Sequence, residues 1–159
     1  SANALALTAA TNDATRVMEQ IRQQSTGVGC TVPRIQPPTG TSWDAWLESA
    51  SGGGKSFAPT PTLNELIAVT CQNESGTGYC GPSQVGAGEW VSAQADPNPL
   101  YDPLRVTVAV CWRNWQRVVG ECVWTGDLAA QNGAPGAPNA DNRAIESPAM
   151  LTTLVTCRG

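Results

Sequence analysis

Residues 4–24 constrain the fold of this chain more than any other stretch, because they agree on one secondary structure. Alanine is frequent there, and neither glycine nor proline interrupts before Gly27, so we expect a helix of about 20 residues that ends near Gly27. At 100° per residue, the apolar side chains fall within an arc of roughly 100°, which is typical of a helix with one buried stripe. The stripe comprises Leu7, Ala10, Ala14, Val17, Met18 and Ile21. The rest of the chain is expected to pack against it.

The other side of the predicted helix carries an apolar residue that the stripe does not explain. Leu5 lies roughly 160° from Leu7 on the helical wheel, so it faces away from the expected core. It is either part of a frayed end or a contact for a partner, together with Thr8 and Asn12 near it. The remaining circumference is polar and is expected to face solvent; it holds Asp13, Arg16, Glu19, Gln20 and Gln23.

The cysteines indicate an exported, disulfide-bonded protein. There are six, all after the helix: Cys30, Cys71, Cys80, Cys111, Cys122 and Cys157. An even number in a chain rich in glycine, proline, serine and threonine is typical of a disulfide framework formed in an oxidising compartment. A zinc site is the competing interpretation, but the chain has no C-x-x-C pair and no histidine.

The spacing of the cysteines suggests, but does not determine, how they pair. A Cys71–Cys80 bridge would close a small loop, and a Cys30–Cys157 bridge would tie the carboxyl end to the connector after the helix. Cys111–Cys122 is possible if the two lie opposite each other in a hairpin. Six cysteines allow fifteen pairings, so the connectivity stays open.

Length and charge fit a single domain that does not bind nucleic acid. The chain has 159 residues, within the usual size of one domain. It has nine basic and thirteen acidic residues and a single lysine, Lys55, so it offers no basic patch to a polyphosphate. It contains neither a signal peptide nor an apolar run of about 20 residues.

After the helix, the sequence predicts mainly antiparallel strands. We expect strands at residues 66–71, 90–93 and 150–157, and a hairpin in which residues 105–112 pair with 118–124. If Cys111 lies opposite Cys122, the hairpin turn falls near Gln116 and Arg117. Residues 126–147 are long and polar and are expected to form a surface loop.

A short helix is expected before the sheet. Thr41 or Ser42 can cap it, it runs from Trp43 to Leu47, and the glycines of residues 51–54 end it. Residues 51–56, SGGGKS, superficially match a phosphate-binding loop. They fail that motif because Ser49 stands where it requires glycine and no apolar strand precedes the loop.

Several segments resemble type IV minor pilins of the pilus-modification kind. The first are ALALTAA at residues 4–10 and ATRVMEQIR at 14–22. The hairpin from VCWR (110–113) to GECVW (120–124) and the ending SPAMLTTLVTC (147–157) are also similar to that group. The likeness covers roughly a third of the chain.

The resemblance implies an α+β headgroup, with a long N-terminal helix packed on an antiparallel β-sheet and stabilised by disulfides. Residues 1–26 would be the C-terminal half of a longer helix, and residues 27–159 the connector, sheet and loops of one domain. The family implies an inner-membrane precursor, anchored by an N-terminal helix and processed by a prepilin peptidase. Its mature form would join other pilins in a cell-surface type IV pilus or a type II secretion pseudopilus, acting in filament initiation, a tip complex or adhesion.

An enzyme is the first alternative, and the residues argue against it. Nucleophilic catalysis by serine or cysteine usually needs an imidazole to accept the proton, and the chain has no histidine. Paired carboxylates could support glycoside hydrolysis, but no spacing selects two of the candidates. These are Glu89, Asp96, Asp102, Glu121 and Asp127. We therefore expect no catalytic site and no cofactor.

A secreted, disulfide-rich carbohydrate-binding or adhesin module is the second alternative. The chain has six tryptophans, and an exposed indole is a good platform for a glycan. Most are expected in the core, but Trp115 lies beside the predicted turn and is the candidate surface platform. Asp127, Asn139 and Asp141 are weak calcium candidates because they share one polar loop, although they lack EF-hand spacing.

Overall fold

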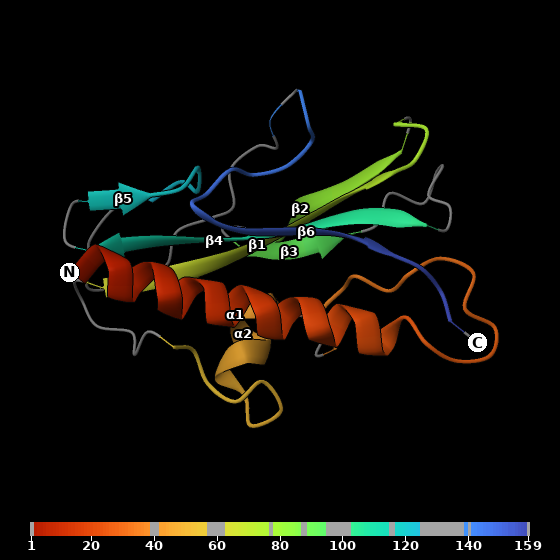
Figure 1. The fold of residues 1–159 in the computed structure, drawn as a ribbon, viewed down its shortest axis with the longest axis horizontal. Helices are drawn as coiled ribbons and strands as arrows, with labels where there is room; N and C mark the ends of the chain where they lie inside the picture. The colour runs from red at the N-terminus through yellow and green to blue at the C-terminus, as the bar shows by residue number, and fades with distance from the viewer. Residues whose placement is uncertain are drawn as a thin grey trace.

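The chain folds as an α+β structure in which a long N-terminal helix covers an antiparallel sheet, as the sequence predicts (Figure 1). The computed structural model describes residues 2–38, 42–56, 63–76, 78–86, 89–94, 103–114, 117–124, 139 and 141–158, with the backbone alone at 2–3, 82–86 and 89–94. The helices are α1 (Ala2–Gln24) and α2 (Trp43–Glu48). The strands are β1 (Leu63–Asn73), β2 (Tyr79–Gly86), β3 (Glu89–Gln94), β4 (Leu104–Asn114), β5 (Arg117–Val119) and β6 (Ala149–Val155).

Strand β4 is the centre of the sheet. The order is β3-β2-β1-β4-β5, with β6 also paired to β4. β4 pairs with β1 from Leu104 to Asn114, while its other edge pairs first with β6 and then with β5. All these pairs are antiparallel. Figure 1 shows α1 running along β4 and β6, with α2 beneath α1.

The main core lies between α1, α2 and one face of the sheet. Alternate residues of β1 and β4 point to this face, including Ile67, Val69, Val106, Val108 and Val110. They meet the stripe of α1 that begins at Ala10 and ends at Ile21. α2 contributes Trp43, Trp46 and Leu47. A smaller cluster, with Leu66, Ala68, Cys111, Cys122 and Ile145, covers part of the opposite face.

Two predictions about α1 were wrong. Leu7 was expected in the buried stripe but is 39% exposed, because the side of the first turns that packs against the core carries Ala6, Ala9 and Ala10 instead. Asp13 was expected to face solvent but is fully buried. It lies three residues after Ala10 and four before Val17, so it belongs to the same face of the helix as those core residues.

The hairpin was predicted in the wrong register. Trp112 pairs with Val119 and Asn114 with Arg117, so Arg117, which was expected near the turn, is already paired in β5, and the register is shifted by one residue. β5 ends at Val119, and Cys122 lies beyond the paired residues. Gly120 lets the chain turn after β5, so that Cys122 still reaches Cys111. Its φ is +96°, and a Cβ there would stand 2.6 Å from the Sγ atom of Cys111.

Three other strands were predicted correctly, and one strand was not predicted. The strands expected at residues 66–71, 90–93 and 150–157 are present as β1, β3 and β6. β2 was not predicted, because its segment contains two glycines and a proline. Most of the predicted loop at 126–147 lies outside the described residues.

Candidate functional site

The outer face of α1, defined as Leu5, Thr8, Thr11, Asn12 and Thr15, is the candidate partner surface. Leu5 is 74% exposed, and Thr8, Asn12 and Thr15 are also exposed. Leu5, Thr8, Asn12 and Thr15 recur at a spacing of three and four residues, so they form one row on the side of the helix away from the sheet. The structure therefore brings together the three residues that the sequence selected: Leu5, Thr8 and Asn12.

The threonines of this face are already hydrogen-bonded within the helix. The hydroxyl of Thr8 donates to the carbonyl of Ala4 at 3.0 Å, and that of Thr11 to Leu7 at 2.8 Å. Thr15 donates to Thr11 at 2.9 Å. A partner that covers these side chains meets their methyl groups and leaves no hydroxyl group without an acceptor. Burial of this face therefore carries a small desolvation cost.

The structure contains three disulfides: Cys30–Cys157, Cys71–Cys80 and Cys111–Cys122. These are the pairings suggested by the sequence. Cys71 and Cys80 are direct cross-strand partners of β1 and β2, with Cα atoms 4.9 Å apart. Cys30–Cys157 joins residues 127 positions apart and closes most of the chain into a loop.

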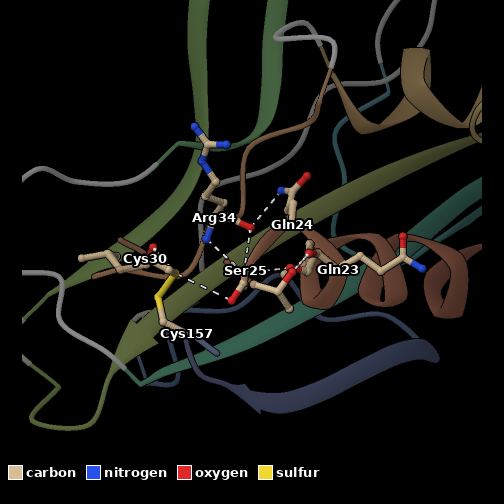
Figure 2. The surroundings of a disulfide bond; sticks show 9 residues. Gln23, Gln24, Ser25, Cys30, Arg34 and Cys157 are labelled. Atoms are coloured by element: carbon tan, nitrogen blue, oxygen red, sulfur yellow. Dashed lines mark hydrogen bonds between the residues drawn. A yellow bond between two sulfur atoms is a disulfide. The ribbon is translucent and has the colours of Figure 1, made fainter. Parts of the chain in front are cut away.

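Figure 2 shows how Ser25 organises the end of α1 around the Cys30–Cys157 bridge. The buried Ser25 hydroxyl donates to the carbonyl of Ile21 at 2.8 Å and accepts the backbone N–H of Arg34 at 3.0 Å. The carbonyl of Ser25 accepts the N–H of Arg158 at 3.1 Å. The end of α1, the connector and the last residues of the chain therefore form one unit, which we call the disulfide clamp (residues 24–36 with 157 and 158).

The glycine run at residues 52–54 builds a tight loop after α2. A Cβ at Gly52 would lie 2.0 Å from the carbonyl oxygen of Trp46, so only glycine fits. Gly53 and Gly54 have φ values of +82° and +87°, which glycine adopts without strain. The loop turns Lys55 inward, where its side chain is 3% exposed. An inward lysine cannot hold a phosphate at the surface, in agreement with the rejection of the phosphate-loop match.

A polar cluster lies beneath α1, where the sequence predicted none. Its members are Asp13, Arg16, Asp44, Lys55, Ser56 and Glu65. The Asp13 carboxylate accepts bonds from Arg16 and from the N–H and hydroxyl of Ser56. Arg16 also donates to the carbonyls of Gly52 and Gly54. Two residues of α1, Asp13 and Arg16, thus bond the helix to the loop after α2.

The charges of the cluster shift one another's pKa. Burial opposes the ionisation of Asp13, but hydrogen bonds from Glu65, Ser56 and Arg16 outweigh it and hold its pKa below the ordinary value. Burial also acts on Lys55, yet the carboxylate of Asp44, 2.8 Å from its Nζ atom, raises the pKa of this lysine. Burial raises the pKa of Asp44 despite that partner. Burial and then Asp13 raise the pKa of Glu65 to about 10.

The other predicted site residues are only partly described. Trp115 and Asp127 lie outside the described residues. The side-chain oxygen of Asn139 accepts the N–H of Asp141 at 2.8 Å, an ordinary turn contact. Within the described ranges, no three His, Cys, Asp or Glu side chains are grouped to hold a metal ion. Trp43, Trp46 and Trp112 are buried in the core, as expected of most tryptophans.

The chain matches no family model, no curated protein and no solved structure. The comparisons therefore add no function to the geometry. In the part of the chain that is described, no helix is long and apolar enough to cross a membrane.

Proposed function

We propose that this protein is a non-enzymatic assembly subunit of a bacterial type IV pilus or type II secretion pseudopilus, of the minor-pilin class. The observation that carries the proposal is the outer face of α1. Its start presents an exposed leucine beside threonines whose hydroxyls are satisfied internally. Such a face suits close packing against another helix, because small side chains allow a near approach and no donor is stranded.

The distribution of charge along α1 supports the same function. From Ala2 to Asn12 the helix has no charged residue, and the first one, Asp13, is buried. Charged side chains at the surface of α1 begin with Arg16, which is one-third exposed. The first three turns can therefore be covered by a neighbouring subunit without desolvating an ion.

The disulfide framework supports export and assembly. Disulfides persist in oxidising compartments such as the periplasm and the cell surface. The disulfide clamp fixes the far end of α1 to the connector and the carboxyl end, so the helix is held rigidly at that end. A rigid helix keeps its outer face at a fixed angle to the sheet, as subunits packed in a filament require.

The proposal is tested by charging the outer face in the bacterium that makes the protein. Leu5→Asp is expected to abolish or strongly reduce filament assembly or filament-dependent secretion, because an unpaired carboxylate would be buried in the subunit interface. Leu154→Asp is the matched control: Leu154 is also an exposed leucine, 52% accessible, but lies on β6 near the opposite end of α1. Normal assembly with Leu5→Asp at normal protein levels would refute the proposal.

The coding sequence upstream of Ser1 provides an independent check. The proposal requires a short basic leader followed by about 20 apolar residues there. A plain cleavable signal peptide would favour the secreted carbohydrate-binding alternative instead.

A further inference from the structure

Glu65 is a buried acid without a conventional hydrogen-bond donor. It is 1% exposed and lies on the α1 side of β1, opposite Trp112 of β4. Among the described residues, no N–H or O–H group donates to either of its carboxyl oxygens. Asp13 of α1 is also fully buried, and both acids meet the same segment: the Ser56 hydroxyl donates to the Asp13 carboxylate, and the preceding Lys55 donates to the backbone carbonyl of Glu65.

Two carboxyl groups buried in one cluster avoid mutual repulsion only if one of them carries a proton. Asp13 already accepts from Arg16 and from the N–H and hydroxyl of Ser56, which favours its ionised form. Glu65 has no such donors and is 1% exposed, so the proton resides on Glu65. The arrangement resembles other buried carboxyl pairs that hold one proton between them.

We propose that Asp13 and Glu65 form a buried proton-binding site that couples the docking of α1, and of the loop after α2, onto the sheet to the external pH. The loop depends on Asp13 through Ser56 and on Arg16 through the carbonyls of Gly52 and Gly54. Loss of the shared proton would place two negative charges together between α1 and β1. The contacts that hold the loop and the helix would then weaken together.

The surrounding charges do not remove this repulsion. Besides Arg16, the nearest cation is Lys55, whose Nζ atom is bonded to Asp44 at 2.8 Å and to the backbone carbonyl of Glu65 at 3.0 Å. Glu48 of α2 approaches the same Nζ atom at 3.6 Å. Lys55 is therefore shared among acids already, and β4 offers only the uncharged Trp112 opposite Glu65.

The sign of the pH dependence follows from the pKa of Glu65. This pKa rises from an ordinary 4.5 to about 10, so between these values the folded chain binds a proton that the unfolded chain releases. The stability that this proton contributes is therefore fully present below about pH 4.5 and is lost as pH rises toward about 10, by up to about tenfold in the folding equilibrium constant per pH unit. The raised pKa of Lys55 contributes stability that is lost only above about 10.5, and the lowered pKa of Asp13 only below about 3.8.

Glu65→Gln tests the proposal, because glutamine is nearly isosteric and permanently neutral. Urea unfolding of the wild type and the variant is measured at pH 5, 7 and 9. The ratio of the variant's folding equilibrium constant to that of the wild type is expected to rise about a hundredfold between pH 5 and pH 7, or about 2.7 kcal/mol. Any constant difference in packing cancels, since only the change with pH is compared. Parallel pH profiles would overturn the proposal.

A second measurement keeps the proposal testable if the variant does not fold. Carboxyl carbon NMR of the labelled wild-type protein should show one glutamate that does not titrate between pH 5 and pH 8, and a midpoint below pH 6 for every glutamate would overturn the proposal. Calcium and magnesium are the controls for a different occupant. If either ion raised the midpoint of the wild type but not that of Glu65→Gln, the site would bind a cation and the proton assignment would be wrong.

Discussion

Removing the Cys30–Cys157 bridge should destabilise the protein about twice as much as removing Cys71–Cys80. The bridges close loops of 127 and 9 residues. The loop-entropy relation then gives about 5 kcal/mol for the first and about 2.6 kcal/mol for the second. The two bridges nested inside the larger loop shorten its effective length only slightly, and the dependence on length is logarithmic. Paired Cys→Ala variants make the comparison, since alanine adds no polar group.

Thermal unfolding by calorimetry is the assay. For a chain of this size, each 1 kcal/mol shifts the midpoint by about 2–4 °C, so the expected losses are about 10–20 °C for Cys30→Ala/Cys157→Ala and about 5–10 °C for Cys71→Ala/Cys80→Ala. Burial alone predicts the opposite order, because Cys71 and Cys80 are 2% and 1% exposed while Cys30 and Cys157 are only partly buried. An equal or larger loss for Cys71→Ala/Cys80→Ala would refute the loop-closure reasoning.

Other substitutions test the packing of α1 and the loop after α2. Ile21→Ala should lower the unfolding free energy by about 2–5 kcal/mol, since it leaves a cavity in the core, whereas Leu5→Asp should change it by no more than about 0.5 kcal/mol in urea titrations. Gly52→Ala should cost about 1–3 kcal/mol, because the new Cβ meets the backbone of Trp46, and an unchanged midpoint would show that the loop is placed wrongly. Ser25→Ala should cost about 1–3 kcal/mol by leaving the N–H of Arg34 without its acceptor, measured by the same titration. Mass spectrometry without reduction should find no free thiol in the native protein, as the three disulfides require.

Periodicity was sufficient to predict the elements that bury a regular stripe. α1, the central strands and the α2 cap at Ser42 follow from residues whose local preferences agree with their tertiary contacts. β2 was missed because its segment lacks the alternation that marks a half-buried strand. The hairpin was displaced by one residue because the pairing assumed that Cys111 faces Cys122, whereas Gly120 lets the chain bend back after β5.

One candidate site could be predicted from the sequence and the other could not. The outer face of α1 could be predicted, since the position of Leu5 on the wheel depends only on helix geometry. The polar cluster could not, because Asp13 and Glu65 are 52 positions apart and meet only after α1 docks on β1. One signal was present and unused: Asp13 stands midway between Ala10 and Val17 on the apolar side of the helix, where a carboxylate must find partners.

The most direct test of the proposed assembly function is photo-crosslinking in the cells that make the protein. A photo-reactive amino acid replaces Leu5 in one strain and Leu154 in another, and the adducts are identified by mass spectrometry. The proposed function predicts crosslinks from position 5 to another filament subunit and none from position 154. No adduct at position 5, or the same adducts from both positions, would contradict a role of the outer face of α1 in assembly.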